Sequence, residues 1–188
     1  MKKLLLTFAA VLLVSFFASA QKKYSVYAVG FYNQENLFDT CHDEGKKDYD
    51  FLPNGSYHWD GLKYSHKLHN MARALADMGT DVLPNVGCAM IGLAEVENAK
   101  VLTDLVNQPA LKARNMQFVH IEGPDKRGID CAMLYNPSLF KLESDTLYQY
   151  VQELEKDSAF KTRGFLTIHG RLADEPVTVI VCHWPSRF

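Results

Sequence analysis

Residues 89–107, AMIGLAEVENAKVLTDLVN, decide the fold class because they join a buried strand to an amphipathic helix. The apolar run 89–94 predicts a short strand that ends at Glu95. Asn98 can cap a helix over about 99–107, where apolar residues recur at three- and four-residue spacing. A carboxylate that leaves an apolar strand is costly to desolvate unless a cation or a donor meets it. Glu95 is therefore the first candidate site residue. The alternative is that this acid interacts favourably with the positive end of the following helix dipole.

The segment before this unit predicts another strand and helix. Residues 24–32 are apolar on both faces, which is typical of a strand buried in a sandwich. Asn33 and Glu35 follow at the end of this strand, and we expect them to lie on one face because strand side chains alternate. Residues 39–61 predict a long loop, and the apolar spacing in 62–78 predicts a helix that lies on a sheet.

The rest of the chain predicts mostly strands, and the last two are joined by a hairpin connection at 173–176. Helices near the start followed by a run of strands indicate an α/β or α+β layered fold with mixed sheets. The composition, 47% hydrophobic and 22% charged in 188 residues, suits one globular domain. The predicted strands are 117–121, 129–135, 140–148, 164–172 and 177–182.

The first twenty residues predict a cleaved secretory signal peptide. Two lysines and the apolar run 4–17 precede Ala-Ser-Ala at 18–20. A membrane anchor is the alternative, but the apolar run is short for a bilayer span. We therefore expect a signal peptide over 1–20 and an exported chain, periplasmic or secreted, with no membrane span after cleavage. Cleavage removes two lysines and no acids, which changes the formal charge from -2 to -4. The net basic charge that is typical of nucleic-acid-binding domains is therefore absent from this chain.

The spacing of cysteines and histidines does not predict a zinc site. Four cysteines allow three complete disulfide pairings, among which the sequence cannot choose. No two of them form a C-x-x-C knuckle, so we expect free buried thiols or one disulfide. His66 and His69 lie one turn apart on the predicted helix without an evident third ligand, which favours a solvated face. The cysteines are Cys41, Cys88, Cys131 and Cys182.

Two further strand ends carry polar side chains that suit a phosphate. Arg127, next to a glycine, can present its guanidinium fork to a phosphate, or it can pair with Asp130 and fix the turn. His183 follows the buried strand 177–182 and can hydrogen-bond a phosphate or protonate a leaving oxygen, although a single strand-end histidine is often structural. Magnesium takes one or two carboxylates and keeps several waters, so Glu95 is a credible anchor for it.

Four segments, in their order and spacing, resemble the endonuclease/exonuclease/phosphatase family, and they look most like its exported bacterial branch. The resemblance implies part of a four-layer α/β/β/α sandwich with mixed sheets. It also implies a hydrolase of phosphate esters, namely a phosphodiesterase, nuclease or phosphatase, that uses Mg²⁺ or alternatively Mn²⁺ or Ca²⁺. The expected substrate is a nucleic acid, sugar phosphate, inositol phosphate or phospholipid headgroup, with no obligate protein partner. The segments are YNQENLFD at 32–39, IGLAEVEN at 91–98, RGIDCAMLYNP at 127–137 and HWPSR at 183–187.

The resemblance also implies roles for individual residues. Glu95 is the principal metal ligand, and Glu35 and Asn33 lie beside the metal and the scissile phosphate. His183 is a catalytic residue together with Asn33 and Glu95, and it contacts the phosphate or assists the leaving group. The remaining two implied residues bind substrate: Arg127 and Asp130.

The chain departs from the family pattern in three ways. Cys182 stands where this branch usually has Asn, and Gly164 stands where an Asp is expected. The later Gly-Asp-x-Asn and closing Asp-His motifs, which orient and deprotonate the attacking water, do not occur up to Phe188. We therefore expect 21–188 to be the N-terminal part of the domain, with the C-terminal portion missing and catalysis incomplete. The alternative is an exported binding protein that keeps the fold and a phosphate-sized cleft without turnover.

Overall fold

The computed structural model describes residues 24–149, 151–154, 158–161 and 163–184. The predicted signal peptide lies outside these residues. Within the described ranges, no helix combines the length and the apolar content that a membrane crossing needs.

A four-stranded mixed sheet forms the middle of the molecule, with the strand order β1-β2-β4-β3. The pair β1 and β2 is parallel, and the other two pairs are antiparallel. The parallel pair requires a crossover, which α2 supplies, and this confirms the predicted order of strand, helix, strand and helix. The strands are β1 (Ala28–Leu37), β2 (Cys88–Val96), β3 (Gln117–His120) and β4 (Asp130–Tyr135).

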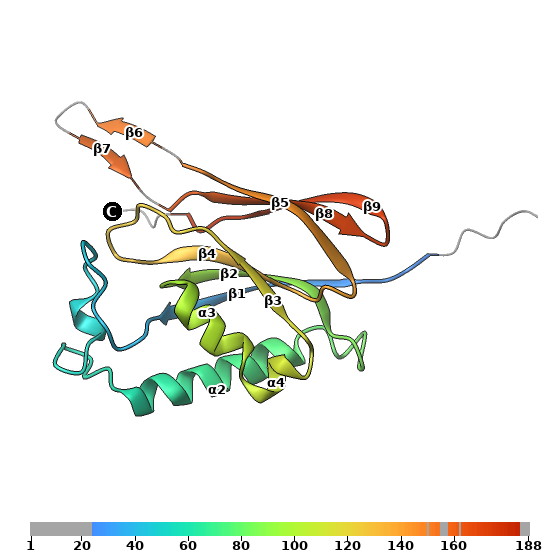
Figure 1. Cartoon of the computed structure of the whole chain (residues 1–188), viewed down its shortest axis with the longest axis horizontal. Helices are drawn as coiled ribbons and strands as arrows, with labels where there is room; N and C mark the ends of the chain where they lie inside the picture. The colour runs from blue at the N-terminus through green and yellow to red at the C-terminus, as the bar shows by residue number, and fades with distance from the viewer. Residues whose placement is uncertain (1–23, 150, 155–157, 162, 185–188) are drawn as a thin grey trace, which may run out of the picture.

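Helices cover one face of this sheet (Figure 1). The side chains of Asp60 and Asn98 cap the N-termini of the two longer helices. Asp60 accepts a hydrogen bond from the backbone N–H of Lys63, and Asn98, as predicted, accepts one from the backbone N–H of Val101. Leu75, Leu102 and other apolar residues of the helices are fully buried against β1 and β2. The sequence did not predict the short α4, which starts with a proline at its first position. The helices are α2 (Gly61–Asp77), α3 (Ala99–Val106) and α4 (Pro109–Lys112).

A second, antiparallel sheet packs on the opposite face of β2 and β4, with the order β5-β8-β9. Its core includes Met133, Phe140 and Leu166, all of which are fully buried. The layers in Figure 1 are thus helices, mixed sheet and antiparallel sheet, an α+β sandwich as predicted. A hairpin of β6 and β7, which the sequence did not predict, forms a separate two-stranded sheet. These strands are β5 (Phe140–Tyr148), β6 (Val151–Leu154), β7 (Ser158–Lys161), β8 (Phe165–Leu172) and β9 (Glu175–Val181).

The prediction that the first strand is buried on both faces is wrong. β1 is an edge strand of its sheet, and Val29 and Phe31 on one of its faces are 60% and 54% exposed. The second sheet packs over β2 and β4, and an apolar pattern in one strand cannot reveal how far a neighbouring layer extends. The strand also runs past the predicted end at 32 and reaches Leu37.

The β8–β9 hairpin is tighter than the predicted four-residue connection. Its strands leave only Ala173 and Asp174 unpaired between Leu172 and Glu175. Both connecting residues have a positive φ, 51° and 64°. This is the backbone conformation of a two-residue hairpin turn whose twist matches that of its strands.

The long loop after β1 is held by its aromatic residues. Phe38 stacks on Phe51 with ring centroids 4.2 Å apart, and the rings of Phe51 and Trp59 form a T-shaped pair. The Trp59 Nε1–H also donates to the carbonyl of Phe38 at 3.0 Å. These aromatic side chains therefore pack the loop against the end of β1.

All four cysteines are free thiols in this structure. Cys41 is exposed, Cys88 and Cys131 are buried, and Cys182 is half-buried. Burial raises the pKa of the Cys131 thiol to about 12, so this side chain behaves as a small apolar group.

Candidate active site

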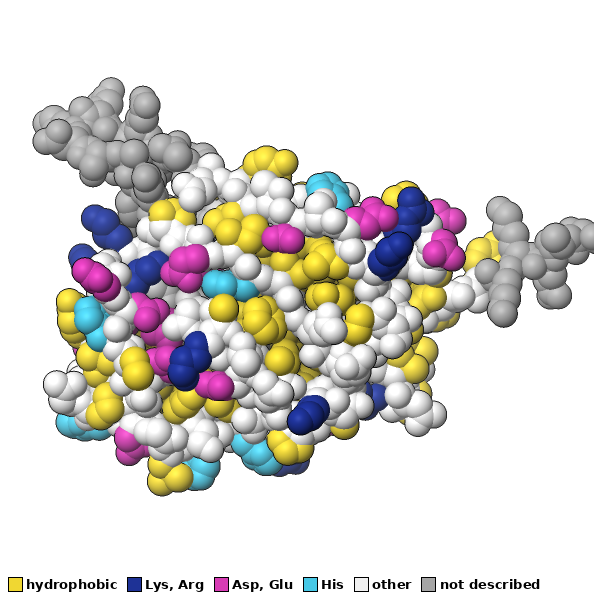
Figure 2. Space-filling view, in the orientation of Figure 1, with side chains coloured by type: hydrophobic (Ala, Val, Ile, Leu, Met, Phe, Trp, Pro, Cys, Tyr) yellow, Lys and Arg dark blue, Asp and Glu magenta, His cyan; other side chains and the backbone are white. Residues whose placement is uncertain are grey.

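The neighbouring strands β1 and β2 both become irregular at their C-terminal ends. Glu95 has a φ of +60°, and Glu35 and Asn36 have φ values of +50° and +63°. The β1–β2 and β2–β4 registers shift at these positions. Non-glycine residues in this conformation are strained and cluster at functional sites. Figure 2 shows acidic, basic and histidine side chains interspersed at this end of the molecule.

The carboxylate of Glu95 lies between β1 and the residue that follows β9. Its Oε2 accepts a hydrogen bond from the backbone N–H of Asn36 at 2.9 Å. Its Oε1 faces Nε2 of His183 at 3.7 Å, which is beyond hydrogen-bonding distance, and the two side chains are only 13% and 22% exposed. One oxygen of Glu95 is thus fixed by the backbone, while the other is available to a cation.

Asn36 connects Glu95 to Arg127. The Arg127 Nη2–H donates to Oδ1 of Asn36 at 2.8 Å. The predicted substrate-binding arginine therefore lies at the Glu95 site. Asn36 itself was not among the predicted site residues, although it belongs to the YNQENLFD segment.

The structure places Asp130 away from this contact. Its side chain is buried, accepts a hydrogen bond from the backbone N–H of Gly123 at 3.1 Å, and lies 3.3 Å from Nε2 of His120. Arg127 and Asp130, both within the described residues, do not form the turn-fixing ion pair considered as the alternative. Asp130 instead fixes the loop that carries Arg127.

Asn33 and Glu35 lie in the irregular end of β1. Oδ1 of Asn33 accepts a hydrogen bond from the backbone N–H of Glu35 at 2.8 Å. The predicted common face relied on regular strand alternation, which ends at Glu35 because of its left-handed backbone. Glu35 is exposed. The negative charges of Glu35 and Glu95 both act to raise the pKa of Lys67.

Lys67 of α2 contacts the same strand end, which the sequence did not predict. Its ammonium donates to the carbonyl oxygens of Glu35 and Asn36, the latter at 3.1 Å. Burial lowers the pKa of Lys67, and the carboxylates of Glu35 and Glu95 partly oppose that shift. The sequence carried no signal beyond a polar position on an amphipathic helix, because the contact depends on tertiary packing.

His183 lies in a cationic neighbourhood. Burial and then the charge of Arg163 lower its pKa, while Glu95 raises it. Its Nδ1 is buried and has no hydrogen-bond partner within the part of the chain that the structure describes. The neutral imidazole is therefore the favoured form at neutral pH, and it can donate one hydrogen bond to a ligand.

Asp130 belongs to a second group of possible metal ligands. His120, Glu122 and Asp130 each offer one ligand atom, and these atoms lie within 4.8 Å of one another. Glu122, however, pairs with the Lys46 ammonium at 2.9 Å, and Asp130 is already held by a backbone N–H. These groups are satisfied without a cation. His66 and His69 are exposed on α2, as expected for a solvated face.

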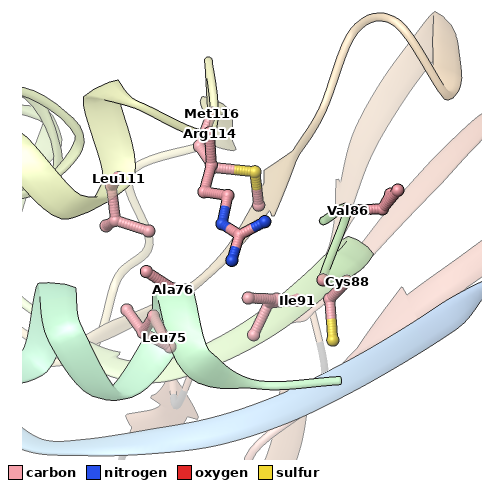
Figure 3. A pocket seen from close by; sticks show the side chains of 9 residues that line it. Leu75, Ala76, Val86, Cys88, Ile91, Leu111, Arg114 and Met116 are labelled. Carbon is pink, nitrogen blue, oxygen red and sulfur yellow. The ribbon is translucent and has the colours of Figure 1, made fainter. Parts of the chain in front are cut away.

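A small apolar cavity lies apart from these residues, between α2, α4 and the start of β2 (Figure 3). Its volume is about 10 Å³, room for roughly one water molecule. Figure 3 shows the Arg114 guanidinium near Ala76, Ile91 and Met116. None of the predicted site residues lines this cavity, so it is a packing gap in the helix–sheet core.

The fold is an α+β sandwich, and a carboxylate, a histidine and an arginine lie at or just beyond its strand ends. The chain belongs to the Endonuclease/Exonuclease/phosphatase family, whose model matches residues 28–188. Membership indicates metal-dependent hydrolysis of phosphate esters in general. A comparison with curated proteins gave no match.

Proposed function

We propose that this chain is an exported, divalent-metal-dependent hydrolase of phosphate esters, a phosphodiesterase, nuclease or phosphatase that uses Glu95 as its metal ligand. The proposal depends above all on Glu95, which is held at 2.9 Å by Asn36 and turns its other oxygen toward His183 at 3.7 Å. A largely buried carboxylate with one unoccupied oxygen suits Mg²⁺, and also Mn²⁺ or Ca²⁺.

The donor set fits a hard cation. Carboxylates of Glu95 and Glu35 and the amide of Asn33 offer oxygen, the ligand type that Mg²⁺ prefers. When bound, such an ion acts as a Lewis acid that stabilises charge on a phosphoryl oxygen. Glu95 remains oriented throughout because the backbone of Asn36 holds its Oε2.

The other residues act on the phosphate and the leaving group. Arg127 binds a phosphate oxygen, and Asn36 holds its guanidinium in place at 2.8 Å. His183 donates a hydrogen bond to the phosphate, which suits an imidazole whose pKa is lowered by burial and by Arg163. Metal binding is the first test, because the proposal depends on Glu95 as the metal ligand.

The test is a titration of the purified chain with Mn²⁺, followed by electron paramagnetic resonance. Glu95→Gln keeps the size of the side chain and removes its charge, and we expect at least a roughly tenfold loss of affinity. Glu143→Gln is the matched control, because this exposed glutamate of β5 pairs with Arg171. Equal Mn²⁺ affinity in the wild type and both variants contradicts the proposal.

The substrate class is tested separately with a panel of DNA, sugar phosphates, inositol phosphates and sphingomyelin in the presence of Mg²⁺. The formal charge of -4 without residues 1–20 favours a small phosphate ester over a long polyanion. Binding of panel members without turnover supports the alternative of a phosphate-binding protein. Export is tested by sequencing the N-terminus of the mature chain, which we expect to begin at Gln21.

A further inference from the structure

We propose that the loop between β1 and α2 holds a structural Ca²⁺ ion between three of its aspartates and Glu97, apart from the metal site proposed at Glu95. The three aspartates are Asp39, Asp43 and Asp48. The inference is independent of the proposed function, because none of these four residues takes part in it.

Glu97 carries a buried carboxylate with one oxygen that lacks a partner. The residue is only 1% exposed, and its Oε2 accepts a hydrogen bond from the backbone N–H of Asp39 at 2.6 Å. Its Oε1 is buried and has no hydrogen-bond partner among the residues that the structure describes. Buried carboxylates are normally hydrogen-bonded and paired with a cation. This oxygen is therefore available to an ion.

Hydrogen bonds bring the three aspartates to Glu97. The backbone of Asp39 donates to Glu97 itself. Nδ2 of Asn98, the next residue, donates to Oδ2 of Asp43 at 3.1 Å, and the backbone N–H of Asp43 donates to Oδ2 of Asp48 at 2.7 Å. Burial raises the pKa of Glu97, and the charges of the three aspartates add to that rise, which agrees with this placement. Four carboxylates thus gather where the loop meets the segment between β2 and α3.

The described part of the chain offers these carboxylates little positive charge. The ammonium of Lys100 lies 3.5 Å from Oδ2 of Asp39, but it is 58% exposed and also pairs with Asp104 at 3.0 Å. Nδ1 of His42 lies 2.5 Å from Oδ1 of Asp48, and this imidazole is charged only when protonated. Buried charges are paired or coordinate metals, so four carboxylates with one shared ammonium favour a bound cation.

The donor set suits Ca²⁺ better than a transition metal. Carboxylates are hard oxygen donors, and Ca²⁺ takes about six to eight oxygens in a flexible geometry. Among the described residues, no three of these side chains already have ligand atoms within 4.8 Å of one another. Binding therefore draws the loop toward Glu97, and the ion should stabilise the loop as well as the charges.

The test is thermal unfolding of the chain with EDTA or with saturating Ca²⁺, each variant being compared with its own Ca²⁺-free Tm. We expect Ca²⁺ to raise the Tm of the wild type by roughly 5 °C. Glu97→Gln and Asp43→Asn keep the side-chain size and remove a charge, and each should lose most of this shift. Asp50→Asn is the matched control and should keep it, because this exposed aspartate of the same loop bonds only Ser56.

Glu95→Gln separates this ion from the one in the proposed function. A Ca²⁺ shift that persists in Glu95→Gln and is lost in Glu97→Gln and Asp43→Asn supports the inference. No shift in the wild type, or an undiminished shift in both Glu97→Gln and Asp43→Asn, overturns it. Loss of the shift in Glu95→Gln also overturns it and assigns Ca²⁺ to the proposed metal site. Failure of the wild type to bind Mn²⁺ overturns the proposed function alone.

Limited digestion with trypsin gives a second readout on the same variants. Lys46 and Lys47 lie in the loop, and exposed loops are preferred sites of cleavage. We expect Ca²⁺ to slow cleavage at these lysines several-fold in the wild type and in Asp50→Asn, and not in Asp43→Asn. Circular dichroism confirms folding, and Asp43→Asn serves alone if Glu97→Gln does not fold, because Asp43 is only half-buried.

Discussion

The backbone N–H of Asn36 donates a hydrogen bond to Oε2 of Glu95 at 2.9 Å, and this contact joins the ends of β1 and β2 into one site. The side chain of the same asparagine holds Arg127. The two functions of Asn36 can be separated, because its left-handed backbone is one that glycine adopts without strain.

Asn36→Gly keeps the backbone hydrogen bond to Glu95 and removes only the contact with Arg127. We expect Mn²⁺ affinity to stay within about twofold, while phosphate affinity falls several-fold because Arg127 loses its orientation. Parallel titrations with Mn²⁺ and inorganic phosphate check this. Loss of both affinities would mean that the side chain supports the metal site as well.

Lys67→Met should destabilise the fold by about 1 to 2 kcal/mol, because the carbonyls of Glu35 and Asn36 lose a charged donor at a strained turn. Urea unfolding measures this change. Lys63→Met, on the same helix, is the control because its exposed ammonium donates only to the carbonyl of Tyr57. Equal effects of the two substitutions would show that Lys67 is an ordinary surface lysine.

Glu97 should make stability fall as the pH rises. Burial raises its pKa to about 8, and Asp39, Asp43 and Asp48 add to the shift, although the backbone N–H of Asp39 opposes it. A raised folded-state pKa favours the protonated form, so this stabilisation is complete below about pH 4.5 and is lost as the pH rises toward 8.

Glu97→Gln mimics the protonated form and should stabilise the protein at pH 8 by about 1 kcal/mol or more, with little effect at pH 4.5. Thermal unfolding across this range measures the difference. The same destabilisation by Glu97→Gln at both pH values would show that Glu97 is charged in the folded state at pH 8.

Gly164→Asp, which restores the residue expected from the family, should destabilise the fold. A Cβ at this position would lie 2.6 Å from the carbonyl oxygen of Tyr148, a backbone atom, and 2.9 Å from the side chain of Leu147. We expect a loss of about 1 to 3 kcal/mol in urea unfolding. Gly61→Ala is the control, because a Cβ there meets nothing within 4 Å. A neutral Gly164→Asp would show that the loop before β8 adjusts freely.

The sequence predicted those parts of the molecule that depend on local pattern. The spacing of apolar residues located α2 and α3, and Asn98 marked the start of α3 because its side chain caps the helix. Glu95 stood out because an acid after an apolar strand needs a partner. The exposed face of β1 was not predicted, since burial depends on whether another layer covers the strand.

The missed site residues depend on tertiary contacts. Lys67 reaches β1 from a helix 31 residues further along the chain, and no local pattern distinguishes it from other lysines on α2. The positive φ values of Glu35, Asn36 and Glu95 interrupt two strands whose apolar patterns gave no sign of them.

Crystals of the chain soaked in Mn²⁺ and measured at the manganese absorption edge test whether Glu95 binds the metal, because anomalous scattering locates the ion itself. We expect a peak within about 2.5 Å of Oε1 of Glu95, on the side that faces His183. A well-occupied peak among His120, Glu122 and Asp130, with none at Glu95, would contradict it.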